Sequence, residues 1–337
     1  RMPMPRPWYE IDNVADIPSP ALAVYPERIA ENVRRVVSRV GGDPSRVRMH
    51  VKTHKLPEVV QIQRDAGIGK FKVATIAEAE MVAETGAEDI LLAYHLVGPN
   101  VGRFATLCRR FPHVRFSCLA DDVGAIRSLS AALVAAEERA GALVGLDTGV
   151  HRTGIAPDER AEAVYRAIVE LPAVLPGGFH VYDGHHRQQD FNRRVEAVNA
   201  SFRDVERLRD RLLDAGLPLP RIVAGETPTF PVHAQHADRE PRPGTCTFWD
   251  FGYRDKLPEL DFLFAAVLVT RVISRPTERR VCLDLGYKAI AADNPQPRVE
   301  LFGYESAQAV IHNEEHLTIE TDAPCALEVG DVLYGIP

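Results

Sequence analysis

The stretch of this 337-residue chain best suited to chemistry is a short basic run with a lysine between two histidines. It reads His50-Val-Lys-Thr-His-Lys55 and continues the strand-like residues 48–51, so Lys52 is expected at the carboxyl end of a strand. Chains that alternate strands with helices place their chemistry at such ends. A lysine held there can attack a carbonyl as a nucleophile and then act as a base. An isolated lysine pair at this spacing is more often a solvated turn.

The elements that would position this lysine follow from a regular alternation of strand-like and helix-like segments. The strand-like segments are residues 21–25, 48–52, 71–75, 90–94, 115–120, 143–148, 178–182 and 221–225. The helix-like segments between them are residues 27–40, 58–66, 77–85, 101–111, 122–140, 159–170 and 191–215. Repeating units of this kind over this length predict an α/β fold with a closed parallel (β/α)8 TIM-type barrel.

The rhythm changes after about Pro258, where β-like runs are separated by turn residues and no clear amphipathic helix occurs. This pattern predicts a separate C-terminal β-domain. We therefore expect three parts: an N-terminal segment at residues 1–18 packed with the β-domain, a barrel at residues 19–257, and the β-domain at residues 258–337.

Composition excludes several classes of protein. A net charge of −7 does not suggest a nucleic-acid surface. The five cysteines are widely spread and never in C-x-x-C spacing, which argues against a disulfide framework and a zinc ribbon. The longest apolar run, residues 262–269, is far shorter than the ~20 residues of a membrane helix. The proline-rich, charged start is unlike a signal peptide, so we expect a soluble cytoplasmic protein.

Polar residues at the predicted strand ends would converge on one mouth of the barrel. They are Lys52, Thr75, Tyr94, Asp147, Tyr182 and Gly225. A glycine-punctuated loop, residues 147–154, presents Arg152 just beyond its strand. Two further loops, residues 225–229 and 242–245, offer glycine backbone and threonine hydroxyls. Together these two loops predict a phosphate cradle, at the end of the barrel where phosphate sites usually lie.

With these motifs in place, the sequence resembles the pyridoxal-phosphate enzymes of the alanine-racemase type (fold type III), and among them the D-threonine aldolase and D-serine dehydratase group. The resemblance covers essentially the whole chain. The most specific matches are His50-Val-Lys-Thr-His-Lys55, Val73-Ala-Thr-Ile-Ala-Glu-Ala-Glu80, Asp147-x-Gly-x-x-Arg-x-Gly154, Gly225-x-Thr-Pro-Thr229, Arg242-Pro-Gly-Thr245 and Asp284-Leu-Gly-Tyr-Lys-Ala-Ile-Ala-Ala-Asp293.

The resemblance implies a role for each predicted site residue. Lys52 would bond covalently to the aldehyde of pyridoxal 5′-phosphate, and Lys55 would be a solvated neighbour. Arg152 and Tyr182 would flank the pyridine ring or the substrate. Whether Arg152 or Arg242 faces the ring nitrogen stays open. The residues implied to hold the phosphate are Gly225, Thr227, Gly244 and Thr245.

The resemblance also implies a divalent metal (Mn, Mg or Zn) and a head-to-tail homodimer. In the relatives a histidine and a nearby aspartate or cysteine hold the metal, after a segment much like residues 330–337. The sequence stops at Pro337, so the metal ligands are unknown here and are expected beyond it, with the β-domain apparently truncated. In the dimer, one subunit's β-domain would complete the other's barrel mouth, which would give residues 284–293 a functional role.

The function implied is that of a lyase acting on D-β-hydroxy amino acids. The favoured activity is that of a D-threonine aldolase, which cleaves its substrate to glycine and an aldehyde. The alternatives are a D-serine or D-3-hydroxyaspartate dehydratase, an amino-acid racemase, and a non-catalytic cofactor-binding protein, against which the β-domain counts. A metal-only barrel hydrolase using His50, His54 and His185 is a further alternative. No nucleic-acid or membrane partner is expected.

Overall fold

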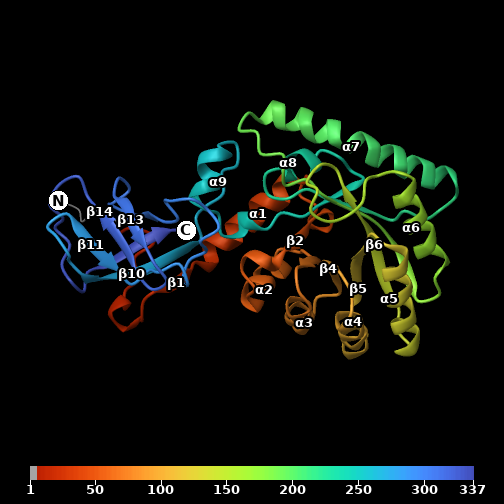
Figure 1. Ribbon diagram of the computed structural model, residues 1–337, viewed down its shortest axis with the longest axis horizontal. Coiled ribbons are helices and arrows are strands. Elements are labelled where there is room, and N and C mark those ends of the chain that lie inside the picture. Colours follow the sequence, from red (N-terminus) through yellow and green to blue (C-terminus); the bar gives the residue numbers. More distant parts are fainter. Residues whose placement is uncertain (1–5) are drawn as a thin grey trace. The chain divides into compact units, whose positions relative to one another are not determined.

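The computed structural model describes residues 6–337, which form two compact units (Figure 1). The barrel unit comprises Ile29–Thr247 and Lys256–Phe262. The β-unit comprises the described residues up to Arg28 together with Phe248–Asp255 and Leu263–Pro337. Residues 1–5 of the predicted N-terminal segment lie outside the described residues.

The barrel unit contains an eight-stranded sheet in which every neighbouring pair is parallel and the strands follow one another in chain order. The strands are β2 (Arg48–His50), β3 (Lys70–Val73), β4 (Asp89–His95), β5 (Arg115–Ala120), β6 (Ala140–Asp147), β7 (Val174–Tyr182), β8 (Ile222–Ala224) and β9 (Arg239–Pro241). The backbone N–H of His50 donates to the carbonyl of Pro243 at 3.0 Å, which connects the first strand to the chain just after the last. The predicted TIM-type barrel is confirmed.

The prediction was wrong about the first and the last strand of the barrel. The first strand-like segment forms β1 (Ala21–Val24), which pairs antiparallel with β10 (Ala266–Ser274) in the sheet of the β-unit. The eighth barrel strand is β9, which carries an arginine, a glutamate and a proline in its three residues and has no strand pattern. Hydrophobic periodicity indicates an extended segment but does not say which sheet it joins.

The helices lie between successive strands, and their starts are marked by capping side chains. The α-helices are α1 (Pro26–Arg39), α2 (Pro57–Asp65), α3 (Ile76–Glu84), α4 (Pro99–Arg110), α5 (Val123–Ala135), α6 (Glu159–Glu170), α7 (Phe191–Asp214), α8 (Phe230–His233) and α9 (Phe251–Lys256). The 3₁₀ turns are η1 (Val14–Asp16), η2 (Pro44–Arg46), η3 (Val51–Thr53) and η4 (Thr245–Thr247). Thr75, Asp122 and Asp190 each accept a hydrogen bond from the backbone N–H three residues later. In Figure 1, α2 to α6 follow one another beside the parallel strands.

No helix in residues 6–337 is both long and apolar enough to cross a membrane.

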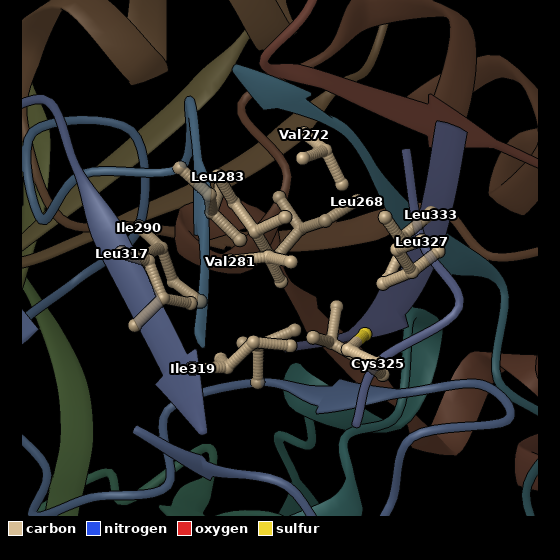
Figure 2. Packing of buried hydrophobic residues seen from close by; sticks show 13 residues of the cluster. Leu268, Val272, Val281, Leu283, Ile290, Leu317, Ile319, Cys325, Leu327 and Leu333 are labelled. Carbon is tan, nitrogen blue, oxygen red and sulfur yellow. The ribbon is translucent and has the colours of Figure 1, made fainter. Parts of the chain in front are cut away.

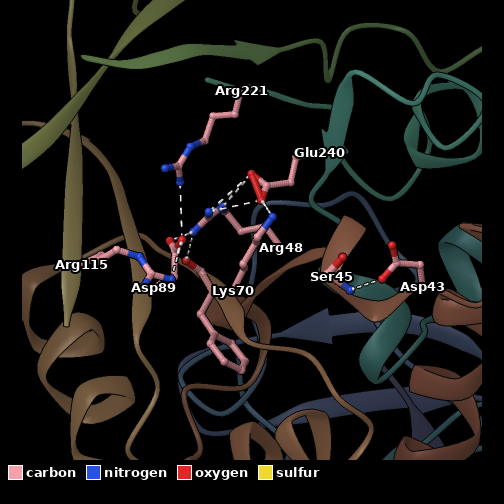
Figure 3. Close-up of polar contacts among 9 residues, drawn as sticks. Asp43, Ser45, Arg48, Lys70, Asp89, Arg115, Arg221 and Glu240 are labelled. Atoms are coloured by element: carbon pink, nitrogen blue, oxygen red, sulfur yellow. Dashed lines mark hydrogen bonds and ion pairs between the residues drawn. The ribbon is translucent and has the colours of Figure 1, made fainter. Parts of the chain in front are cut away.

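The interior of the barrel is filled by side chains in layers, as in other barrels of this type. An apolar cluster comes from four strands and consists of Leu91, Leu119, Leu143 and Val223. At the amino-terminal ends of the strands lies a charged group instead. There Arg48, fully buried, contacts Asp89 at 2.7 Å and Glu240 at 3.3 Å (Figure 3). Three further cations touch these two carboxylates and complete what we call the floor network: Lys70, Arg115 and Arg221.

The β-unit is built on an antiparallel sheet with the order β12-β15-β10-β11-β14-β13, and β1 pairs with β10. Its remaining strands are β11 (Arg280–Leu283), β12 (Glu300–Leu301), β13 (Gln308–His312), β14 (Leu317–Glu320) and β15 (Val332–Ile336). Side chains such as Val281, Leu317 and Ile319 converge in an apolar core (Figure 2). Asp284, for which a role in a dimer was predicted, accepts hydrogen bonds from the Thr270 hydroxyl at 2.7 Å and the Arg271 N–H at 2.9 Å. Within the β-unit this carboxylate therefore connects the residue after β11 to β10 by hydrogen bonds.

Candidate active site

Lys52 lies on a tight turn just after the first barrel strand rather than in the strand itself. β2 ends at His50, and η3 carries Lys52 with an exposed side chain. His50 points into the barrel, where its Nδ1 lies 3.0 Å from the backbone carbonyl of Lys72 on the next strand. The same Nδ1 lies 3.4 Å from the backbone N of Lys52, so the imidazole also caps the turn that carries the lysine. Lys55, predicted to be a solvated neighbour, is exposed and pairs with Glu78. Lys52 therefore follows the carboxyl end of β2, and the last residue of that strand, His50, is hydrogen-bonded to β3.

Arg152 and Tyr182 come together at the carboxyl ends of β6 and β7. The guanidinium of Arg152 lies 4.5 Å from the centre of the Tyr182 ring, a cation–π contact. Asp147 orders the loop before Arg152, since one of its oxygens accepts from the N–H groups of Gly149, Val150 and His151. Burial raises the pKa of Asp147, but these backbone hydrogen bonds outweigh it and the net pKa is lowered. A charged carboxylate thus holds the arginine loop.

The two predicted phosphate loops are next to each other in the structure. The N–H of Gly244 donates to the hydroxyl of Thr227 at 3.3 Å, and both residues are buried. Gly225 has φ of +80°, and a Cβ placed on it would lie 2.5 Å from the His233 ring. A Cβ on Gly244 would lie 3.0 Å from the Cβ of His50. Thr245 is partly buried at the start of η4. Neither glycine carries a side chain that would block a phosphate at these two loops, and the Thr227 hydroxyl that accepts from Gly244 lies between them.

A buried network that the sequence analysis missed supports the first of these loops. The carboxylate of Asp183 accepts from the Thr229 hydroxyl at 2.8 Å and contacts His233 Nε2 at 2.6 Å. The same Thr229 oxygen accepts from the N–H of Glu226 at 3.0 Å, which closes the turn after Gly225. Burial raises the pKa of Asp183, but the interaction with His233 outweighs it, so the pKa is lowered. Asp183 is the first residue after β7, which ends at Tyr182. The sequence analysis considered the last residue of this strand and not the one that follows it.

Arg242 is the most deeply buried cation near the mouth. Its Nη2 donates to the carbonyl of Val181 at 3.1 Å, and its guanidinium lies 5.2 Å from the centre of the Tyr182 ring. Its Nε has no hydrogen-bond partner among the described residues. Burial lowers the pKa of Arg242, and Asp183 partly opposes this. A buried guanidinium with an unused donor beside two glycine loops fits an anionic, planar ligand such as a phosphorylated pyridine.

No three His, Cys, Asp or Glu side chains of residues 6–337 come together as a metal site. The rings of His185 and His186 have their centres 3.9 Å apart and are tilted by 39°, and His186 Nε2 contacts the Ser201 hydroxyl at 2.9 Å. His50, His54 and His185, the three histidines of the hydrolase alternative, do not form such a group. The described residues therefore do not support the hydrolase.

We expect Gly225→Ala to weaken both the fold and the phosphate loop. A side chain at φ of +80° is strained by about 1–2 kcal/mol, and this Cβ would also displace the His233 ring. Gly216→Ala is the matched control, because Gly216 has φ of +74° but nothing within 4 Å of its Cβ. Urea unfolding should show a loss of stability for both variants. Only Gly225→Ala should weaken binding of pyridoxal 5′-phosphate, and equal binding by both variants would contradict the assignment of this loop.

Comparison with known proteins gives two family matches that together span most of the chain. The model of the alanine racemase N-terminal domain matches residues 24–250, and that of a putative serine dehydratase domain matches residues 265–337. D-threonine aldolase from Arthrobacter sp. is 25% identical over 99% of this chain and 88% of its own length. D-threo-3-hydroxyaspartate dehydratase from Delftia sp. (strain HT23) is 27% identical over 87% of this chain and 78% of its own length.

A solved structure of similar fold is that of D-threonine aldolase from Filomicrobium marinum. It superposes with a TM-score of 0.89 at 23% identity, covering 96% of this chain and 88% of that one. At this level of identity the likeness shows the fold. Since it extends over nearly the whole of both chains, the barrel and the β-unit have counterparts in that structure.

Proposed function

Because this chain belongs to the alanine racemase N-terminal domain family, in its D-threonine aldolase group, we propose that it is a pyridoxal-phosphate-dependent lyase acting on D-β-hydroxy amino acids. The observation that carries the proposal is the meeting of Thr227 and Gly244 beside a buried, incompletely paired Arg242. These groups suit a phosphate and a pyridine ring, and Lys52 is at the same mouth. Bound there, the cofactor would supply the electron-withdrawing group that stabilises negative charge on the substrate.

The protein's own residues would bind the ligand, orient it and move protons. Lys52 would hold the aldehyde carbon and later exchange a proton with the substrate. The N–H groups of Gly225 and Gly244, with the hydroxyls of Thr227 and Thr245, would bind the phosphate. Tyr182 would stay protonated, because burial and the hydrogen bond to the Glu226 carboxylate raise the pKa of its hydroxyl.

We assign Arg242 rather than Arg152 to the ring nitrogen. Arg242 is buried among the strand ends with an unused Nε, whereas Arg152 is exposed and stacks on Tyr182 from the loop side. An arginine in a protein does not give up its proton. Facing the ring nitrogen, it would donate to it and keep that nitrogen unprotonated. Arg152 would then be free to meet the substrate.

Within this class we favour the D-threonine aldolase, with the dehydratase as the second candidate. The relative that spans more of both chains is an aldolase at 25% identity, and the dehydratase is 27% identical over a shorter stretch. The divalent metal and the homodimer are part of the same proposal. The division at residues 18 and 257 stays a prediction.

Product analysis separates these activities. The purified protein is incubated with D-threonine and D-serine, with a chelator, and with the chelator followed by added Mn²⁺. We expect glycine and acetaldehyde from D-threonine, lost with chelator and restored by the metal. A keto acid with ammonia would instead establish the dehydratase. Conversion to the L-amino acid alone, or no reaction of the cofactor-loaded protein, would contradict the lyase.

A further inference from the structure

Lys72 is a second lysine of the barrel interior, and the proposed function gives it no role. On β3 it is in register with His50 of β2 on one side and with Leu91 of β4 on the other. Lys70, two residues earlier and therefore on the same face, reaches Glu240 of β9 at 2.8 Å. This face of β3 consequently points into the barrel. Lys72 itself is 4% exposed.

Lys72 has no partner for its charge among the described residues, in contrast to the buried Arg48, Arg194 and Arg239. Among the described residues its ammonium group makes no hydrogen bond and no ion pair. Arg48 is paired with two carboxylates, Arg239 with Glu206, and Arg194 with Glu259. A buried lysine without a counter-ion is costly, so it either loses its proton or waits for an anion.

The charged and titratable groups around Lys72 come from β2, β7 and the loops after β2, β6, β8 and β9. Burial lowers the pKa of Lys72 well below its ordinary value, and Arg242 and Lys52 lower it further. Arg152 acts in the same direction, and Glu226 is the one acid that opposes them in the described surroundings. The two imidazoles nearby, His50 and His180, are themselves buried, and burial lowers the pKa of each, so both are neutral. Around Lys72, three cationic residues thus act against one acidic residue.

We propose that Lys72 binds an anionic oxygen of the phosphorylated pyridine and takes up a proton from solvent as that ligand enters. The inference rests on the proposed function, because it requires this ligand at this mouth. The amine is neutral in the cofactor-free chain, where cations surround it. The ligand's negative charge reverses the local balance, so the ammonium form becomes the stable one. Cofactor binding is thereby coupled to pH through a residue other than Lys52.

The test measures proton uptake on binding by the full-length chain freed of cofactor. The probe is pyridoxine 5′-phosphate, which has the ring oxygen and the phosphate but no aldehyde to condense with Lys52. Calorimetric titrations at one pH in Pipes and in imidazole, which differ in ionisation enthalpy, give the number of protons taken up. We expect about one proton per site from Lys72. A parallel titration with inorganic phosphate shows whether the phosphate or the ring oxygen is the partner.

Three variants isolate the contribution of Lys72. Lys72→Met keeps the length and removes the charge, so it should lose this proton uptake and bind the probe about 10–100-fold more weakly. Lys72→Arg stays protonated at all times and should bind without the uptake. Lys256→Met, at the exposed end of α9, is the control and should behave as the unsubstituted chain.

Stability of the cofactor-free chain gives an independent readout. A lysine with a lowered pKa in the folded chain reduces stability at every pH below its ordinary pKa, and stability recovers as pH rises toward that value. Lys72→Met removes this penalty, so its melting temperature near neutral pH should be higher than that of the unsubstituted chain. A merely structural lysine would leave the variant less stable.

The possible outcomes distinguish a failure of the proposed function from a failure of the inference about Lys72 alone. If the unsubstituted chain does not bind pyridoxine 5′-phosphate, the proposed function fails and this inference fails with it. If the chain binds the probe but Lys72→Met shows the same affinity and the same proton uptake, only the inference about Lys72 is overturned. A Lys72→Met variant that melts lower or does not fold also overturns it.

Discussion

Lys52→Ala is expected to lose turnover of D-threonine by about 10²–10⁴-fold, the range that a positioned acid or base contributes. The loss follows because Lys52 is the exposed amine just after the first barrel strand, and the proposed function assigns the aldehyde of the cofactor to it. The same variant should also lose the visible absorption band that a lysine-linked cofactor gives. Initial rates of acetaldehyde formation and absorption spectra of the loaded protein provide both measurements.

Two further variants make the Lys52 result specific. Lys55→Ala removes a lysine from the same turn, but this one is exposed and paired with Glu78, so activity should stay near that of the unsubstituted chain. Lys52→Arg keeps a positive charge but cannot condense with an aldehyde, and it should be as inactive as Lys52→Ala. A Lys52→Arg variant with substantial activity would mean that position 52 serves only through its charge.

Arg48→Met is expected to destabilise the chain by about 3–5 kcal/mol, because it leaves two buried carboxylates without their principal counter-ion. Arg48 is fully buried and contacts both Asp89 and Glu240 (Figure 3). Burial raises the pKa of Asp89, but Arg48 outweighs it, and the pKa of this carboxyl is lowered. The lost stability should be measured by urea unfolding near neutral pH.

The control for Arg48 is Arg110→Met on the surface. Arg110 pairs with Glu80 and Glu84, but all three side chains are well exposed, so the loss should be no more than about 1 kcal/mol. Replacing Arg48, Asp89 and Glu240 together by apolar residues should recover much of the stability, since no buried charge is then left unpaired. An Arg48→Met chain as stable as Arg110→Met would show that the floor network does not hold the barrel together.

The barrel could be predicted from sequence because most of its strands are flanked by amphipathic helices with clear breaks between them. The two errors have one physical cause. Residues 21–24 have the composition of a strand, but their partner, β10, lies more than two hundred residues later in the chain. β9 is held by its neighbours although Arg239, Glu240 and Pro241 have no intrinsic preference for a strand. Pairing in the folded chain overrides local pattern in both cases.

The polar interior was much less predictable than the fold. Arg48 meets Asp89 and Glu240 from positions 41 and 192 residues away, and no local pattern indicates such pairs. Lys72 alternates with the buried Phe71 and Val73, which is the normal pattern of a strand with one wet face. Only closure of the barrel turns that face inward. Asp183 and His233 are likewise 50 residues apart, and the fold alone brings them together.

The two glycine–threonine loops could be located from sequence because each is a run of turn-forming residues. Gly225 adopts a positive φ, and Thr227 in the loop after β8 accepts a hydrogen bond from Gly244 in the loop after β9. The sequence did not indicate how deeply each of the two nearby arginine side chains is buried in the folded protein. Arg152 and Arg242 both follow the end of a barrel strand, β6 and β9, yet one is exposed and the other is buried. Burial separates the two candidate partners of the ring nitrogen.

The most direct test of the central claim is to find which amine carries the cofactor. The protein loaded with pyridoxal 5′-phosphate is reduced with borohydride, digested, and mapped by mass spectrometry. We expect the phosphopyridoxyl group on Lys52 and on no other lysine. Modification of Lys72 instead, or a chain with no modified lysine after loading, would contradict the account.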